Sequence, residues 1–257
     1  LIQMTGVKKR FFSHMKMVIC IPSGITEVEK RAVFDSADHV DSKETYLIYE
    51  PMAAALGIGL DVEEPVGNMV IDIGGGTTEI AVIALSGIVS DQSIRTAGDE
   101  FTTDIIGFMK RKHNILIGER TAEQIKINVG AALPELENPP DVFPVNGRDL
   151  MTGIPKQTTI SYQEIAGALD KSISKVEDAI LKALETTPPE LSSDIYSTGL
   201  YLTGGGALLR GLDKRISAKT KLPVHIADDP LRAVVRGTGI ALKNSDRFSF
   251  LIDRKSV

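Results

Sequence analysis

An aspartate followed by three glycines and two threonines is the feature of this chain whose residue types point most directly to chemistry. Asp72 ends an apolar run, and Gly74, Gly75, Gly76 and Thr77 follow it. Glycines let a backbone approach an anion closely and direct N–H groups at phosphate oxygens. Asp72 can hold a magnesium ion through water, and Thr77 can donate its hydroxyl. The pattern favours a phosphate-binding turn over the alternative, a plain glycine hairpin turn.

A second glycine run occurs near the C-terminal end, after the apolar residues 200–202. We expect a helix to begin at about Ala207, so that its N-terminus offers free N–H groups and a positive dipole end to a phosphate or nucleoside. The run lacks the lysine and hydroxyl of a Walker-type loop, which argues against that motif. The residues of this run are Gly204, Gly205, Gly206, Ala207 and Leu208.

Glu50 stands at the end of an expected strand and directly before Pro51. We expect the proline to hold Glu50 out of helical geometry. A carboxylate in that place can orient an attacking water or accept its proton. From the residues alone, the competing interpretation, a solvated loop glutamate, is favoured.

Glu123 and Lys126 lie three residues apart on an expected helix and therefore share a face. The pair could bracket a polar ligand such as ribose or adenine, with Gln124 and Ile125 between them. The alternative is a surface ion pair, which the residues alone favour.

Short apolar strands alternate with helical segments around these residues, which predicts an α/β fold. Thr26 with Glu29, and Ser161 with Glu164, have the spacing of helix capping boxes. After Ser161, apolar residues recur at steps of three and four, which predicts a long helix with a core-facing stripe. We expect strands at residues 17–21, 46–49, 69–73, 79–85, 88–95, 200–202 and 224–226, helices at 26–37, 121–129 and 231–242, an irregular segment at 134–148, and a loosely held tail from residue 244.

Composition excludes several classes of protein. The 257 residues carry 29 basic and 34 acidic side chains, a net charge of −5, which argues against a nucleic-acid-binding protein. The one cysteine, Cys20, lies in an apolar run and is expected to be a buried thiol. No stretch approaches the ~20 apolar residues of a membrane-spanning helix. Because the chain opens on Leu1 without an initiator methionine, we expect a fragment of a longer protein.

Taken in order, these motifs resemble the MreB family of bacterial actin-like proteins. The resemblance runs over residues 15–242 and is carried by the segments 49–55, 72–79, 117–123, 187–191, 202–212 and 229–231. It implies an α/β, actin-like ATPase fold with ribonuclease-H-like sheets and two lobes around a nucleotide cleft. In this chain it implies a remaining part of the first lobe at residues 1–60, a second lobe at 61–243 with a small inserted subdomain at about 98–165, and a C-terminal tail at 244–257.

The resemblance also implies roles for the residues singled out above, with ATP and Mg²⁺ as cofactors. Asp72 would hold the metal. Glu50 and Thr77 would position the hydrolytic water. The phosphates and the nucleoside would be bound by Gly74, Gly75, Gly76, Thr77, Glu123, Gln124, Ile125, Lys126, Gly204, Gly205, Gly206, Ala207 and Leu208.

At the level of the cell, the resemblance implies head-to-tail filaments paired at the inner face of the cytoplasmic membrane. The implied partners are the cell-wall elongation machinery and the membrane surface, which Phe11 and Phe12 could enter beside their basic neighbours. A frayed chain end is an equal alternative for these two residues. The implied location is cytoplasmic and peripheral to the membrane, without nucleic acid as a partner.

Two departures limit this inference. Family members often have two acids before the proline, where this chain has Tyr49 and Glu50. The family's first phosphate loop precedes the part of the fold that begins at Leu1. Two other interpretations therefore stay open: a small-molecule kinase of the same superfamily, and an inactive fragment without tight ATP binding.

Overall fold

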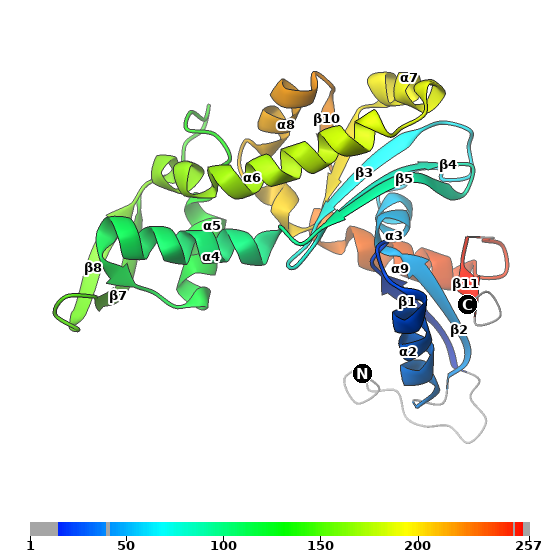
Figure 1. Ribbon diagram of the computed structural model, residues 1–257, viewed down its shortest axis with the longest axis horizontal. Coiled ribbons are helices and arrows are strands. Elements are labelled where there is room, and N and C mark those ends of the chain that lie inside the picture. The colour runs from blue at the N-terminus through cyan, green and yellow to red at the C-terminus, as the bar shows by residue number, and fades with distance from the viewer. Residues whose placement is uncertain (1–14, 40–41, 249, 254–257) are drawn as a thin grey trace.

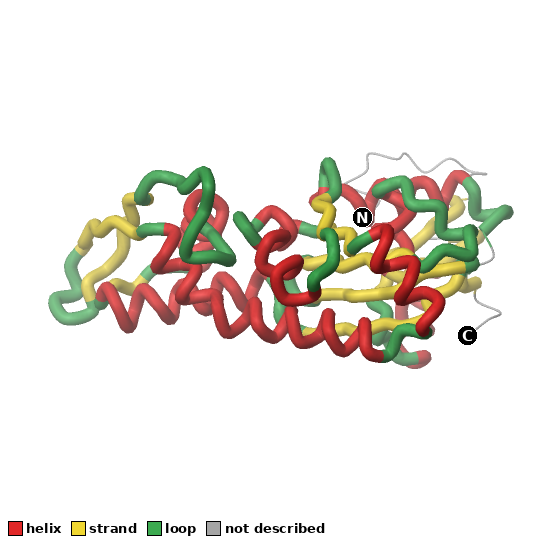
Figure 2. The backbone as a smooth tube through the Cα atoms, turned by 90° about the horizontal axis from the view of Figure 1, so that it is seen from above, coloured by secondary structure: helices red, strands yellow, loops and turns green. Residues whose placement is uncertain are grey.

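The computed structural model describes residues 15–39, 42–248 and 250–253, and its described part contains three β-sheets (Figure 1). Two sheets lie close together with helices around them, and the third forms the far end of an elongated arm. A long helix runs along this arm and connects its two ends (Figure 2). Among the described residues, no helix is long and apolar enough to cross a bilayer.

The first sheet has the order β1-β2-β11. β1 and β2 are parallel, and the helix α2 connects them, beginning with the expected capping box of Thr26 and Glu29. β11 pairs antiparallel with β2, so the prediction of a loosely held tail is wrong for this part of the chain. The aromatic rings of Phe248 and Phe250 pack against the core and bring the tail back to the sheet. The bounds are β1 (Met15–Ile21), α2 (Glu27–Asp38), β2 (Ser42–Tyr49) and β11 (Ile252–Asp253).

The second sheet has the order β10-β9-β3-β4-β5 and forms the centre of the molecule. β3, β9 and β10 are parallel, while β3, β4 and β5 form an antiparallel meander. Every residue of β3 and β4 is buried, because helices cover both faces. The bounds are β3 (Asn68–Ile73), β4 (Thr78–Ala84), β5 (Gly87–Ile94), β9 (Leu200–Thr203) and β10 (Val224–Ile226).

One face of this sheet packs against α3 (Glu50–Gly57) and α9 (Ala233–Lys243). These two helices touch at glycines: a Cβ on Gly237 would lie 1.7 Å from the carbonyl oxygen of Ala53. Only glycine permits so close an approach of two helix backbones. The helix expected at the C-terminal end is thus confirmed, preceded by a short 3₁₀ turn, η3 (Pro230–Arg232).

The opposite face packs against α6 (Tyr162–Glu185), the long helix of the arm. The expected capping box of Ser161 and Glu164 is present at its start. Its predicted apolar stripe is confirmed: Ile165, Leu169, Ile173, Val176 and Ile180 are buried, and Leu184 is partly buried. The other helical elements are α4 (Gly98–Phe108), the π-helical turn η1 (Met109–His113), α5 (Glu119–Val129), α7 (Pro189–Thr198), the 3₁₀ turn η2 (Gly205–Leu208) and α8 (Leu212–Thr220).

The third sheet, β6-β7-β8, contradicts the irregular segment expected at residues 134–148. β7 begins inside that segment, and of its residues only Val145 is buried, so the alternating apolar signal was too weak to read. Pro144 is tolerated because β6 pairs only with Arg148 and Asp149, which leaves that part of β7 with one neighbour among the described strands. The bounds are β6 (Ile115–Leu116), β7 (Phe143–Asp149) and β8 (Pro155–Ile160).

Candidate functional site

The two glycine runs leave the central sheet at the same edge. β3 and β9 are parallel neighbours, and Asp72 lies directly opposite Thr203 in their register. The turn that begins at Gly74 and the turn that begins at Gly204 therefore emerge side by side. In open α/β sheets, ligands bind outside the carboxyl ends of such strands. The fold thus brings together two predicted elements that are about 130 positions apart in the sequence.

The contact between the two turns requires glycine. Gly204 has a φ of +79°, and a Cβ there would lie 2.3 Å from the carbonyl oxygen of Ile73 and 2.8 Å from Oδ1 of Asp72. A Cβ on Gly206 would lie 2.2 Å from Cγ2 of Ile73. These distances are far below van der Waals contact, so side chains at these positions would force the two turns apart. Gly76, by contrast, has open space where a Cβ would be.

The first turn is supported from behind by the N-terminus of α4. The Gly74 N–H closes the turn on the carbonyl of Thr77 at 3.0 Å. The N–H groups of Gly98 and Asp99 donate to the carbonyls of Gly74 and Gly75 at 3.1 and 2.8 Å. Within the described part of the chain, the N–H groups of Gly75, Gly76 and Thr77 have no acceptor, so they could serve an anion.

The second turn differs from the prediction. Gly204 is followed by the 3₁₀ turn η2, and the next α-helix, α8, begins only at Leu212. Glycine has a low helix propensity, so three in a row disfavour an α-helix. Gly211 then adopts a left-handed φ of +76°, which is not α-helical, directly before α8. The dipole of an α-helix starting at Ala207 is therefore absent. Ala207 itself is fully buried, whereas Leu208 is 55% exposed.

Asp72 is a buried carboxylate that accepts a side-chain hydrogen bond. It is 6% exposed, and the Thr203 hydroxyl donates a 2.8 Å hydrogen bond to Oδ1. Burial raises the pKa of Asp72, and the negative charge of Glu79 adds to this, while the hydrogen bond from Thr203 opposes it. No group of three or more metal-binding side chains exists among the described residues. A magnesium ion would therefore depend on one carboxylate, water and ligand phosphates, which is how Mg²⁺ is commonly held.

A row of polar side chains continues across the sheet from Asp72. Residues opposite one another in register share a face, and Thr203, Asp72, Glu79 and Ser93 follow in that order over four strands. On the same face, Val70 and Ala81, which pair in register, are apolar and pack against α3. The polar row thus marks the point at which the core gives way to the site.

Glu79 is a fully buried carboxylate in this row. Its Oε2 accepts hydrogen bonds from the N–H and the hydroxyl of Ser23, at 3.2 and 2.6 Å. Its Oε1 accepts a 2.6 Å hydrogen bond from the Ser93 hydroxyl. Since Ser23 lies just after β1, Glu79 fastens the central sheet to the first sheet beside the candidate site.

Glu50 is placed near these carboxylates, but in a different backbone geometry from that predicted. It is the first residue of α3, with Pro51 in the first turn, where a missing N–H breaks no helical hydrogen bond. The prediction that Pro51 holds it out of the helix is wrong. Burial raises the pKa of Glu50 to about 7, and the charges of Glu79 and Asp72 contribute. A carboxylate with a pKa near neutrality suits a general base.

Glu123 and Lys126 form an ion pair of 2.6 Å on α5 that is linked to the first turn. The Lys126 ammonium also donates to the carbonyl of Gly98 at 2.9 Å and contacts the Thr102 hydroxyl at 3.1 Å. The N–H of Gly98 in turn donates to the carbonyl of Gly74, so Gly98 connects Lys126 to the first glycine turn through hydrogen bonds. The expected ion pair is therefore present beside the site rather than on a remote surface.

Ile125 and Gln124 have different surroundings from that pair. Ile125 is fully buried in the core, so its side chain packs and cannot contact a ligand. Gln124 is exposed, and its carbonyl accepts a hydrogen bond from the Asn128 side chain.

A family model, described as MreB/Mbl protein, matches residues 1–249. The chain belongs to the MreB/Mbl family. It is 46% identical over 239 residues to the cell shape-determining protein Mbl of Bacillus cereus (strain ATCC 10987 / NRS 248), covering 93% of this chain and 71% of that protein. It is 48% identical over 236 residues to the cell shape-determining protein MreB of Escherichia coli (strain K12), covering 90% of this chain and 66% of that one. The chain thus spans about two thirds of the length of that MreB.

Solved structures of MreB and MamK confirm the expected actin-like fold. MreB5 of Spiroplasma citri bound to AMPPNP has a TM-score of 0.88 at 38% identity, over 91% of this chain and 70% of that chain. The same protein bound to ADP has a TM-score of 0.86. A MamK double helical filament has a TM-score of 0.72 at 20% identity, over 90% and 68% of the two chains, and shares the fold.

Sequence reasoning about this MreB/Mbl chain missed three contributors to the site. Thr203 and Glu79 were included only within the segments 202–212 and 72–79, and Gly98 was not singled out. A hairpin closed by the glycine turn pairs Ile73 with Thr78 and therefore Asp72 with Glu79. Because side chains alternate between the two faces of a strand, this pairing could have placed Glu79 on the same face as Asp72. The role of Gly98 depends on a tertiary contact that leaves no local signal.

Two other predictions concern residues outside this edge. Phe11 and Phe12 lie outside the described residues. Cys20 is partly buried, and burial raises the pKa of its thiol to about 12, in agreement with an unreactive structural cysteine.

Proposed function

We propose that this chain is the nucleotide-binding part of an actin-like filament protein that determines bacterial cell shape. The observation that carries the proposal is the pairing of two glycine turns at one sheet edge, held in contact by Gly204 and by the Thr203–Asp72 hydrogen bond. The nucleotides in the MreB5 structures and the names of the curated relatives support it.

The proposed ligand is ATP with Mg²⁺. Gly75 and Gly76 would donate N–H groups to phosphate oxygens, and Thr77 its hydroxyl. Asp72 would hold the metal through water, and the ion would neutralise phosphate charge. Glu123, Lys126, Gly205 and Leu208 would line the nucleoside side, while Ala207 and Ile125 would support it from the core.

ATP hydrolysis is proposed to depend on Glu50 and Thr77. Glu50 stands at the N-terminus of α3, where burial raises its pKa to about 7 and the charges of Glu79 and Asp72 contribute. Such a carboxylate can orient water or accept its proton at neutral pH.

The same proposal divides the chain into lobes. Residues 1–60 belong to the first lobe, residues 61–243 to the second, with the small subdomain at about 98–165, and residues 244–257 to the tail. Since Glu79 on the second lobe bonds to Ser23 on the first, relative movement of the lobes would act on the candidate site.

The proposal extends to assembly and location. Copies of the protein would form head-to-tail filaments in pairs, and the MamK filament structures of the same fold support self-assembly. The filaments would lie at the inner face of the cytoplasmic membrane and organise the cell-wall elongation machinery. Phe11 and Phe12 would enter the bilayer surface, and liposome co-sedimentation should fall when both are made polar.

Calorimetric titration with ATP and ADP, each with and without Mg²⁺, tests the nucleotide site. We expect micromolar binding that weakens without Mg²⁺ and is lost in Gly204→Ala but kept in the control Gly167→Ala, on α6, where a methyl group meets no atom within 4 Å. No binding by the unmodified chain would contradict the proposal. For hydrolysis, Glu50→Gln should stop phosphate release and leave ATP binding intact; unchanged release would exclude its role.

A further inference from the structure

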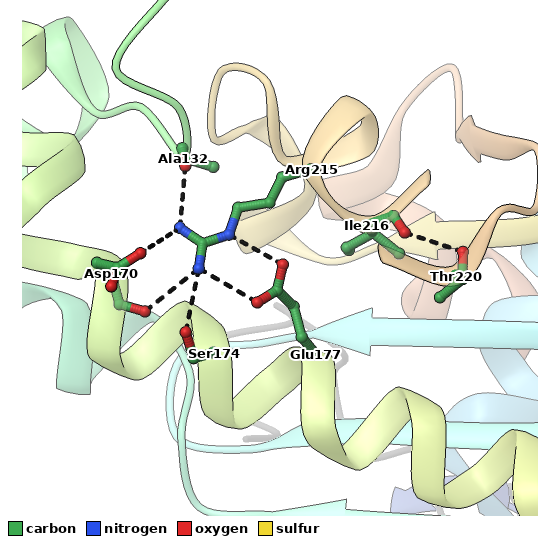
Figure 3. Close-up of polar contacts among 7 residues, drawn as sticks. All are labelled: Ala132, Asp170, Ser174, Glu177, Arg215, Ile216 and Thr220. Carbon is green, nitrogen blue, oxygen red and sulfur yellow. Dashed lines mark hydrogen bonds and ion pairs between the residues drawn. The ribbon is translucent and has the colours of Figure 1, made fainter. Parts of the chain in front are cut away.

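Arg215 on α8 forms a dense set of contacts that the proposed function does not use (Figure 3). Its side chain is 14% exposed and lies against α6. Nε and Nη2 donate to the two carboxylate oxygens of Glu177, at 2.9 and 3.2 Å. Nη1 pairs with Asp170 at 2.8 Å, and Nη2 donates to the Ser174 hydroxyl at 3.1 Å. The three partners lie at steps of four and three on one face of α6.

One further contact of Arg215 reaches outside α6. Nη1 also donates to the carbonyl oxygen of Ala132 at 3.1 Å. Ala132 follows α5 by three residues, beyond Gly130. The guanidinium therefore joins α6, α8 and the segment after α5 at one point. A lysine ammonium could not do so, because it lacks the several N–H donors that the guanidinium holds in one plane.

The segment after α5 is in turn paired with the end of the second glycine run. Ala131 and Arg210 form a parallel β-bridge, and the Ala132 N–H donates to the Arg210 carbonyl at 2.8 Å. The Arg210 guanidinium donates to the carbonyls of Ile127 and Gly130 at 3.2 and 3.4 Å. Arg210 lies two residues after Leu208, and Ile127 directly follows Lys126.

We propose that Arg215 is a positioning residue of the nucleotide site, which holds Ala132 and thereby sets the separation between α5 and the second glycine run. This inference rests on the proposed function, because those two segments are the proposed nucleoside side. The spacing is fixed before a nucleotide binds, so binding need not order the two segments. Pre-ordering of this kind raises affinity by reducing the entropy lost on binding.

The contact of Arg215 with Glu177 allows an effect on nucleotide affinity to be separated from an effect on folding stability. Glu177 is 8% exposed, and removing Arg215 alone would leave a buried carboxylate unpaired. Replacing both partners with leucine removes that problem, since a buried ion pair can often be exchanged for apolar residues without loss of stability. The contacts of the guanidinium with Ala132, Ser174 and Asp170 are then missing, and of these only the contact with Ala132 reaches outside α6. Asp170 is 66% exposed and tolerates the loss of its partner.

The test compares the unmodified chain, the double variant Arg215→Leu/Glu177→Leu, and the control Lys175→Leu. Lys175 is also on α6, but its ion pair with Glu100 is half-exposed and leads to α4. In the ligand-free double variant, hydrogen exchange at the Ala132 amide should be faster while the melting temperature is unchanged. ADP affinity, measured by calorimetry with Mg²⁺, should fall about tenfold. The control should match the unmodified chain in all three.

The outcomes distinguish this inference from the function on which it rests. A double variant that binds ADP as the unmodified chain does, or whose Ala132 amide stays protected, overturns the positioning role and leaves the nucleotide site standing. A fall in affinity that follows a fall in melting temperature also overturns it, since the effect is then general stability. An unmodified chain that does not bind ADP overturns the proposed function and this inference together.

Discussion

Thr203 and Asp72 join the two glycine turns in the interior of the protein: the Thr203 hydroxyl donates a 2.8 Å hydrogen bond to Oδ1 of Asp72. Both side chains are almost fully buried, at 0% and 6% exposure. A hydrogen bond to a buried carboxylate is among the stronger polar contacts, because neither group can turn to water instead. This contact therefore couples the strand that carries the metal candidate to the strand that carries the second turn.

Thr203→Val should show the value of this contact. Valine keeps the shape but removes the donor, so the unfolding free energy at pH 7 should fall by about 2 kcal/mol in urea titrations. Thr203→Ser keeps a hydroxyl and should lose less. Equal losses in the two variants would mean that the methyl packing, and not the hydrogen bond, matters.

Gly204→Ala and Gly76→Ala form a matched pair in the two turns. Gly204 combines a φ of +79° with a Cβ position 2.3 Å from a carbonyl oxygen, so alanine there should cost about 3 kcal/mol of unfolding free energy. Gly76 has no atom within 4 Å of its Cβ position, and alanine there should change stability by less than about 1 kcal/mol. Thermal or urea unfolding of both variants measures the difference, and similar losses would contradict the close contact of the turns.

Glu50→Gln should stabilise the protein in a pH-dependent way. The pKa of Glu50 is about 7 in the folded protein against an ordinary value of 4.5, so the ionised form is less favourable when folded. The penalty is absent below pH 4.5, grows between pH 4.5 and 7, and is complete above pH 7. After a discount for its partial exposure, Glu50→Gln should be more stable by about 1 kcal/mol at pH 8 and equal at pH 4.5.

Unfolding free energies of the two proteins across this pH range provide the measurement. A difference that is constant with pH, or largest at low pH, would show that Glu50 is not a carboxylate of raised pKa.

Glu79→Ala should be strongly destabilising, by about 3 kcal/mol of unfolding free energy. The change removes three hydrogen bonds to a fully buried carboxylate and leaves the groups of Ser23 and Ser93 without their acceptor. Glu137→Ala is the control, since Glu137 is exposed and has one ion pair, with Lys214. That pair should contribute less than about 1 kcal/mol. Comparable losses at Glu79 and Glu137 in urea unfolding would contradict the structural role of Glu79.

Local patterns in the sequence were enough to predict most elements and the glycine turns. Capping boxes fixed the starts of α2 and α6 because their hydrogen bonds lie within four residues. The stripe of α6 was readable because a helix that buries one face must repeat apolar residues at that period. The exposed strand β7 and the tail strand β11 were missed, since neither has a run of alternating apolar residues.

The sequence by itself determined which groups are available for the site: Asp72, the two glycine runs, Glu50, and the pair of Glu123 and Lys126. Only the tertiary structure decided how they meet. Parallel pairing of β3 with β9 places Asp72 against Thr203, and the packing of α3 brings Glu50 toward Glu79. These relations join residues far apart in the chain, so no local spacing encodes them. They arise because the apolar faces of the sheets and helices can be buried together in this one arrangement.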